Sequence, residues 1–367
     1  ISTAVEYAGA LVVDRNRGTW KAKAAVGVSV GVALTFLFIF KYLDFFTFNF
    51  NTIFHTNAKL LELTLPIGIS FYTFQTITYI VDVYRDKAPV QKNFGYLLLY
   101  VSMFPQLIAG PIVKYVDIEA QIRKRTLHGK DVGEGVLRFL TGLFKKAVLA
   151  NVAGEVASTF LDGNLSNLSV LGAWLGILSY TLQIYFDFSG YSDMAIGLGS
   201  MFGFRFNENF NYPYIATSIT DFWRRWHISL SSWFRDYVYI PLGGNRRKTP
   251  RVIFNLMVVW LLTGLWHGAA WNFVLWGMFY GVLLIFEKYV LGDLLPRIPT
   301  PVRWLTTMVL VMCGWVLFSA PDLTGALLYL KAMFGGAAGF TDGNGAYLLS
   351  TNLAVLVLGA FCATPAY

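Results

Sequence analysis

The chain contains few charged residues for its length. Charged side chains make up 14% of its 367 residues, whereas a soluble domain carries about 25%. Hydrophobic residues reach 56%, and the mean hydropathy is +0.53. This composition excludes an ordinary soluble protein and predicts an integral membrane protein.

The sequence also lacks several familiar patterns. Its apolar segments are continuous and do not alternate as the strands of a membrane barrel do, so we expect helices, whose backbone satisfies its own hydrogen bonds in lipid. The two cysteines, Cys313 and Cys362, lie in apolar runs without CxxC spacing, which predicts inert buried thiols. There is no HExxH and no carboxylate cluster with metal-ligand spacing. We therefore expect no metal site and no bound cofactor.

Positive charge is in excess, with a net charge of +8. In a membrane protein, Lys and Arg first report which loops face the cytoplasm, so we expect no nucleic-acid partner. Basic residues at 14–23, 114–130 and 246–251 predict that these segments are cytoplasmic. Residues 82–92 carry Arg85, Lys87 and Lys92 and also look cytoplasmic, so residues 93–113, interrupted by prolines and a glycine, are expected to enter the membrane and return on the same side. The alternative is a full crossing that leaves residues 82–92 outside.

Uninterrupted apolar stretches mark the expected spans at residues 1–13, 24–40, 63–81, 163–186, 304–320 and 343–367. Residues 44–59, rich in aromatic, Asn and Thr side chains, predict a connection at the outer interface. Residues 133–161 predict one helix with two lysines near its middle, which either snorkel to an interface or face a wet cavity. Residues 325–334 are too short to cross. No linker separates a second domain, so residues 1–367 are interpreted as a single integral membrane domain.

The longest uncharged run, residues 252–286, has His267 as its only ionisable imidazole. A helix rises about 1.5 Å per residue and a hydrocarbon core is roughly 30 Å thick. The run is therefore too long for one span, and Gly264, Gly268 and Asn272 mark the expected break. A histidine at this depth is a functional candidate. Packing between helices explains its position equally well.

A second histidine, His227, lies in the segment WRRWHISLSSWFRDY, next to Arg224, Arg225 and Trp226. Tryptophan and arginine are typical of a headgroup interface, and this is the preferred interpretation of the tryptophans and of most arginines. The same arginines also suit an anionic substrate, because a guanidinium binds phosphate through two hydrogen bonds. The segment therefore leaves two interpretations open.

Four further polar residues carry weaker signals. Asp187 and Asp193 follow an apolar run and can pair with the arginines or orient a histidine; structural pairing is the preferred interpretation. His55 and His128 lie in polar connections and are interpreted as solvated. Histidine is therefore the only general base that the sequence offers within the membrane.

Six stretches, taken together and in order, closely resemble the membrane-bound O-acyltransferase family, in its bacterial branch active in alginate O-acetylation. They are LPIGISFYTFQTITYIVDVYR (65–85), FPQLIAGPIVKY (104–115), YFDFSGYSDMAIGLG (185–199), FNENFNYPY (206–214), FWRRWHISLSSWFRDYVYIPLGGNR (222–246) and GLWHG (264–268). Members of the family are usually longer, so the resemblance implies further spans before residue 1. It also implies an all-α polytopic fold, a ring of transmembrane helices with re-entrant and interfacial helices around a thin central site.

The resemblance implies specific roles for the histidines. His267, in the WHG motif, corresponds to the family's catalytic histidine, and His227 to a second histidine associated with activity on the cytoplasmic side. His267 would act as general base or as a transient acyl carrier. We expect donor-binding or supporting roles for six residues: Arg224, Arg225, Trp226, Asp187, Asp193 and Asn272.

The predicted function is a multi-pass O-acetyltransferase of the bacterial inner membrane. It would take an acetyl group from a cytoplasmic thioester, acetyl-coenzyme A or another acetyl thioester, and pass it across the membrane to an extracytoplasmic polysaccharide such as alginate. The resemblance implies a separate periplasmic or surface acetyltransferase as partner, the polysaccharide acceptor reached directly or through it, and surrounding membrane lipid. The alternative is a transporter, a channel or a scaffold of a polysaccharide-synthesis complex without acyl chemistry. A transporter predicts acid–base pairs deep in spans or two related halves, and the sequence shows neither beyond the two boundary aspartates.

Overall fold

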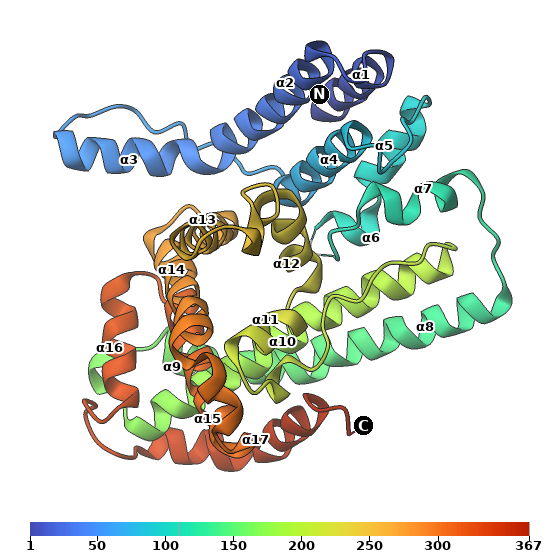
Figure 1. The fold of residues 1–367 in the computed structure, drawn as a ribbon. Coiled ribbons are helices and arrows are strands. Elements are labelled where there is room, and N and C mark those ends of the chain that lie inside the picture. The colour runs from blue at the N-terminus through green and yellow to red at the C-terminus, as the bar shows by residue number, and fades with distance from the viewer. Residues whose placement is uncertain (109, 367) are drawn as a thin grey trace. The chain divides into compact units, whose positions relative to one another are not determined.

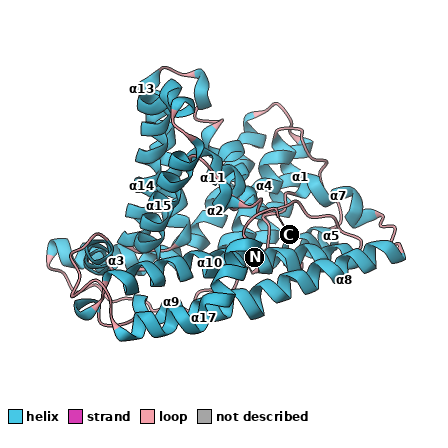
Figure 2. Cartoon of the chain, turned by 90° about the horizontal axis from the view of Figure 1, so that it is seen from below, coloured by secondary structure: helices cyan, strands magenta, loops and turns pink. Residues whose placement is uncertain are grey.

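The computed structural model describes residues 1–108 and 110–366, and the regular elements within this part are helices (Figure 1, Figure 2). Five helical segments of this part are long and apolar enough to cross a membrane: Trp20–Phe54, Thr249–His267, Trp271–Arg297, Thr300–Ser319 and Gly343–Cys362. The expected all-α, multi-pass membrane fold is confirmed.

The helices form two compact units. One comprises Ile1–Phe139 with Met194–Asn207, and the other comprises Leu140–Asp193 with the chain from Glu208 onward. Two long helices, α8 (Gly129–Phe144) and α10 (Val170–Met201), contribute to both units. The interpretation of residues 1–367 as one functional domain stays a prediction.

The first unit is built from its N-terminal helices. They are α1 (Ser2–Arg15), α2 (Trp20–Leu37), α3 (Leu43–Phe54), α4 (Ile69–Tyr84), α5 (Phe94–Ser102), α6 (Phe104–Leu107) and α7 (Tyr115–Arg123), with a π-helical turn at Phe38–Tyr42 joining α2 to α3. The expected connection at residues 44–59 is therefore wrong over most of its length, because α3 continues the preceding helix.

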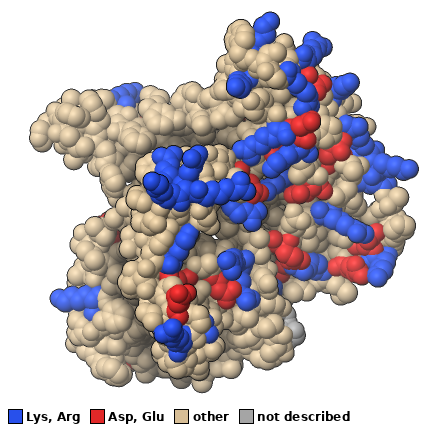
Figure 3. Space-filling view, in the orientation of Figure 1, with Lys and Arg blue, Asp and Glu red and all other residues tan. Residues whose placement is uncertain are grey.

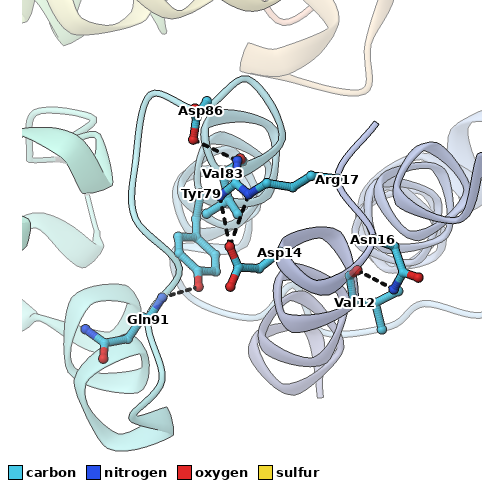
Figure 4. A network of polar contacts seen from close by, with 8 residues as sticks. All are labelled: Val12, Asp14, Asn16, Arg17, Tyr79, Val83, Asp86 and Gln91. Carbon is cyan, nitrogen blue, oxygen red and sulfur yellow. Dashed lines mark hydrogen bonds and ion pairs between the residues drawn. The ribbon is translucent and has the colours of Figure 1, made fainter. Parts of the chain in front are cut away.

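Polar contacts link α1 to α4 in this unit (Figure 4). Arg17 contacts the carboxylates of Asp14 and Asp86 at 3.0 and 2.7 Å, and the backbone N–H of Gln91 donates to the Tyr79 hydroxyl at 3.0 Å. The ion pairs of Arg17 are solvent-exposed, so each contributes about 1 kcal/mol or less. One of the basic side chains in residues 14–23 is thus already paired.

The segment predicted to be re-entrant contains two short helices. Helix α5 ends at Ser102 and α6 begins at Phe104, with Met103 between them in an extended conformation. Pro105 sits in the first turn of α6, where its missing N–H costs no helical hydrogen bond. This break is where the sequence predicts it, and the side on which the segment enters and leaves the membrane stays a prediction.

The second unit contains the remaining helices. They are α9 (Asn151–Leu161), α11 (Ile219–Arg225), α12 (Ile228–Phe234), α13 (Thr249–His267), α14 (Trp271–Phe286), α15 (Thr300–Ser319), α16 (Leu323–Met333) and α17 (Gly343–Cys362). π-Helical turns occupy Lys145–Ala150, Arg235–Tyr239 and Glu287–Leu291, and 3-10 turns occupy Leu165–Asn167, Pro213–Ile215, Gly244–Arg246 and Gly292–Arg297.

Helix α10 differs from the span expected at residues 163–186. It begins at Val170 and continues to Met201, and it is not one of the five span candidates in the described part of the chain. The helix continues past its two aspartates because lysines of the turn Lys145–Ala150 compensate their charges. Lys145 Nζ lies 2.7 Å from Asp193 Oδ2, and Lys146 pairs with Asp187. Lys145 is buried, so for this residue both the snorkelling and the wet-cavity interpretations are wrong.

Helices α13 and α14 lie side by side (Figure 1) and are formed by the run 252–286. The predicted break is confirmed, at Gly268–Ala270. Gly264 and Gly277 allow the two backbones to touch: a Cβ atom at Gly264 would meet the Phe273 carbonyl oxygen at 2.3 Å, and one at Gly277 would meet the Trp260 carbonyl oxygen at 2.2 Å. Small residues permit such close approach of membrane helices.

Candidate active site

His267 is the last residue of α13, directly before the break. Its half-buried ring makes edge contacts with Trp266, Trp276 and Phe318, with centroid distances of 5.0, 5.0 and 5.2 Å. Edge contacts with three aromatic rings restrict the orientation of the imidazole. The helix end thus places a titratable group among apolar rings.

His227 lies between α11 and α12 and is 1% exposed. Its backbone is left-handed, with φ of 43° and ψ of 55°, a conformation that costs a non-glycine residue about 1 kcal/mol or more. Ile228 N–H donates to the Asn209 carbonyl oxygen at 2.9 Å, which helps to hold this turn. The turn directs the imidazole into the interior of the unit.

One indole contacts both histidines. The Trp266 ring is 5.9 Å from that of His227 and 5.0 Å from that of His267. The two motifs, separated by 40 positions in the sequence, therefore meet around one tryptophan.

Asn209 is the hydrogen-bond partner of His227. Its Oδ1 lies 3.1 Å from His227 Nδ1 and accepts from Ser229 N at 3.2 Å and Ser229 Oγ at 2.8 Å. Its Nδ2 donates to Ser192 Oγ at 3.1 Å. The other imidazole nitrogen, His227 Nε2, is buried and has no hydrogen-bond partner among the described residues.

The environment of His227 disfavours a charge on its ring. Burial lowers the pKa of the imidazole well below its ordinary value, and the nearby His267 lowers that pKa further. A desolvated ring is costly to protonate. His227 is therefore neutral at pH 7.

A cavity of about 220 Å³ reaches His227. Its lining includes Arg224 and Arg235, which are exposed, and the tryptophans Trp223 and Trp260, which are buried. The cavity thus leads from a basic surface to a buried neutral imidazole along apolar walls. Such a space suits a ligand with an anionic end and an apolar or neutral end.

The expected donor-binding arginines differ in their surroundings. Arg224 lines the cavity. Arg225 instead pairs with Asp221 at 2.9 Å and donates to the Asn211 carbonyl oxygen at 3.3 Å. The structure therefore brings Arg224 to the cavity and places Arg225 in a local ion pair.

Further basic residues follow this segment. On the face drawn in Figure 3, Lys and Arg gather over the connection between α12 and α13. Three exposed basic residues, Arg246, Arg247 and Lys248, end this connection, and a fourth, Arg251, lies in the first turn of α13.

Trp226 lies in the core. It is 4% exposed and packs against Phe222 and Trp315 with centroid distances of 5.6 and 4.8 Å. Trp223 and Trp233 are also buried. The interpretation of these tryptophans as headgroup contacts is therefore wrong, because their rings pack against other aromatic rings inside the unit.

The two aspartates and Asn272 have structural contacts. Asp187 and Asp193 pair with lysines, as described above, so the preferred interpretation of structural pairing holds, with lysines in place of the arginines. Asn272 is buried in α14 and donates to the Ala320 carbonyl oxygen at 3.0 Å. This bond ties the start of α14 to the end of α15, next to the break that follows His267.

Residues 85–329 match the sequence profile of the membrane-bound O-acyltransferase family. This match covers more than half of the chain and includes both histidines and the cavity. The chain belongs to this family.

Several relatives of this chain have names that specify a polymer. A protein of Azotobacter vinelandii named Probable alginate O-acetylase is 49% identical over 298 residues, 81% of this chain and 59% of the relative. One of the same name from Pseudomonas aeruginosa is 47% identical over 82% of this chain and 57% of the relative. A peptidoglycan O-acetyltransferase of Helicobacter pylori is 40% identical over 80% of this chain and 61% of the relative. The chain spans less than two thirds of the length of each.

Sequence reasoning missed three residues of this candidate site. The surroundings of His227 include Asn209, Ser192 and Ser229. The sequence analysis noted Asn209 only as part of the motif FNENFNYPY and gave it no role. Nothing in that motif predicts that the asparagine contacts a histidine 18 positions later. Glu287 was missed as well: its carboxylate accepts from the N–H groups of Ile219 and Thr220 and caps α11.

Proposed function

We propose that the chain catalyses the transfer of an acetyl group from a thioester donor to an extracytoplasmic polysaccharide. The observation that carries this proposal is the cavity lined by Arg224 and the buried His227, with the ring of Trp266 in contact with both His227 and His267. The names of the relatives support an O-acyl transfer to a polymer, alginate or peptidoglycan. Alginate-like polysaccharide is the acceptor that we propose.

The proposed donor is acetyl-coenzyme A or another acetyl thioester. Its phosphates would lie at Arg224, since a guanidinium group binds phosphate through paired hydrogen bonds. Arg235 also lines the cavity but is paired with Asp236 at 2.8 Å. Its thioester would lie near His227, where the apolar walls exclude water. Arg225, already paired with Asp221, would support the segment that carries Arg224.

In the proposed reaction, an acceptor hydroxyl oxygen attacks the thioester carbonyl carbon. A C–O bond forms and the C–S bond breaks, while the hydroxyl proton passes to His267 and then to the departing thiolate. His267 acts as general base in this scheme, and His227 receives the donor. A transient acyl group on His267 is the covalent variant of the same transfer.

The proposed setting is the bacterial inner membrane, with lipid around the spans. A separate periplasmic or surface acetyltransferase would take over the acetyl group, and the polysaccharide would then be reached through that partner. Direct transfer to the polysaccharide is the simpler route. Purified full-length protein given both acceptors separates the two routes.

The proposal is tested with purified protein in lipid, labelled acetyl-coenzyme A and candidate acceptors. We expect label to move from the donor to alginate or to the partner enzyme, and free thiol to appear in equal amount. Donor consumption without a labelled acceptor would point to hydrolysis. No donor consumption with any acetyl thioester would favour a transporter or scaffold and would overturn the proposal.

Arg224 gives a prediction about donor affinity. Arg224→Gln is expected to raise the KM for acetyl-coenzyme A on the order of 10-fold, because it removes a charge-assisted hydrogen bond of about 1.5 kcal/mol or more. Arg225→Gln is the matched comparison: the same charge is removed, but Asp221 already neutralises it, so a smaller change is expected. Equal KM values for Arg224→Gln and the unmodified protein would show that Arg224 does not bind the donor.

The basic segments give a prediction about topology. Single cysteines placed at Lys21, Lys124 and Lys248 are expected to be protected from an impermeant thiol reagent in intact cells, because Lys and Arg concentrate in cytoplasmic loops. Labelling of the same positions after permeabilisation is the control. A cysteine that labels from outside would reverse the orientation of its segment.

A further inference from the structure

The surroundings of Asn209 fix the orientation of its amide. A backbone N–H can only donate a hydrogen bond, so the atom that faces Ser229 N at 3.2 Å must be an oxygen. The amide nitrogen consequently faces Ser192 Oγ. Asn209 is fully buried, and no solvent competes for these bonds.

The amide orientation in turn fixes the tautomer of His227. A carbonyl oxygen can only accept, so Nδ1, at 3.1 Å from Asn209 Oδ1, must carry the proton. Ser229 Oγ approaches Nδ1 at 3.5 Å but lies closer to Oδ1, at 2.8 Å, to which it donates. A neutral imidazole has one N–H group, and the lone pair is therefore on Nε2.

We propose that Asn209 is a positioning residue for acetyl transfer, which holds His227 in the Nδ1–H tautomer and presents the Nε2 lone pair to the occupant of the cavity. The inference rests on the proposed function in that the occupant is the thioester donor. Nε2 is buried without a partner among the described residues, and His227 lines the cavity. A lone pair there can accept a hydrogen bond or a proton from the donor–acceptor complex, and it cannot donate one.

Asn209 also shapes the backbone next to His227. Its carbonyl oxygen accepts from Ile228 N–H and its side chain accepts from Ser229 N–H, so one residue satisfies two N–H groups at the start of α12, which have no partner within the helix. Removing the side chain would therefore disturb both the tautomer and the local fold. Asn209→Ala is expected to lose transfer about 10- to 100-fold, as for other residues that orient a functional histidine, but this variant alone does not separate the two roles.

The variant Asn209→Asp separates the effect of Asn209 on the His227 ring from its effect on the local fold. A carboxylate keeps the acceptor for Ser229 N–H and for His227 Nδ1–H, but its negative charge favours the imidazolium form. Burial and His267 hold the pKa of His227 low; Asp at position 209 raises it. Because the neutral ring is the active form, transfer is lost as the pH falls through this pKa, and the acid limb of kcat/KM for the donor is expected to move to higher pH by one unit or more, about 1.4 kcal/mol per unit.

Other charged groups around His227 must stay constant in this comparison. They are His267 from α13, Arg224 and Arg235 in the cavity lining, and the Lys145–Asp193 pair beside Ser192 on α10. Asn255→Asp is the matched control. Asn255 is an equally buried asparagine, in α13, that donates to the carbonyl oxygens of Leu242 and Gly244. Its substitution is expected to leave the acid limb in place.

A second readout needs no activity. The protein has four histidines, and in full-length protein labelled with ¹⁵N-histidine and embedded in lipid, His→Gln variants assign each imidazole. We expect the His227 signals to show a protonated Nδ1 and an unprotonated Nε2. The opposite tautomer would overturn the inference, as would an Asn209→Asp protein that transfers acetyl with an unshifted acid limb. If the unmodified protein shows the expected tautomer but transfers no acetyl group, the proposed function is contradicted and the tautomer assignment stands.

Discussion

Replacement of His267 with glutamine is expected to lower acetyl transfer about 10²- to 10⁴-fold, the contribution typical of a general base. His267 is the only imidazole between residues 252 and 286, at the end of α13. Glutamine has similar bulk and can still hydrogen-bond, so it fills the space between Trp276 and Phe318 without restoring a base. Initial rates of labelled acetyl transfer at saturating donor measure the loss.

His128→Gln is the control for this substitution. His128 is exposed and precedes α8, so the same chemical change there is expected to leave transfer unaltered. Expression level and membrane insertion are compared for both variants. Substantial polymer acetylation by a correctly inserted His267→Gln protein would make His267 a packing residue.

His227 gives the second large effect. His227→Gln is expected to lower transfer by about 10²-fold or more, because glutamine cannot replace the neutral imidazole of this buried residue of the cavity lining. The double variant His227→Gln/His267→Gln is expected to be no slower than the more impaired single variant. Residues that serve the same transfer are strongly non-additive.

The double variant also distinguishes this arrangement from independent roles. If the two losses multiply, each histidine contributes without the other. Trp266 packs against both rings, so the folded state of each single variant is compared by near-UV circular dichroism. A double variant that retains the activity of the unmodified protein would show that neither histidine takes part in acetyl transfer.

The sequence alone predicted where His267 lies, because this depends only on the length of an apolar run and on the place where it breaks. The run 252–286 is too long for one span, and its break places His267 at a helix end. The contact between His227 and Asn209 could not be predicted, because it joins two irregular segments whose approach depends on packing around α10. The burial of Trp226 was misjudged for a related reason. Tryptophan next to arginine occurs both in protein cores and at headgroup interfaces, so the local sequence does not distinguish the two environments.

Two helices extend further than composition suggests, for a reason visible in their hydrogen bonds. In α3, Asn49 and Thr52 donate to carbonyl oxygens four residues earlier, Phe45 and Phe48, at 2.7 and 2.9 Å. Polar side chains that bond back to their own helix do not interrupt it. In α10, the carboxylate of Asp193 is compensated by a lysine from a distant segment, which no local pattern can reveal.

The contact between α13 and α14 affects how freely this protein can vary. At Gly264 and Gly277 the helices meet backbone to backbone, so their separation is set by main-chain atoms. Leu261, Leu262 and Val282 of the same two helices are exposed. Exchange of one of these aliphatic side chains for another is therefore expected to leave the main-chain contact unchanged, and with it the position of His267 in the turn of α13 that follows Gly264.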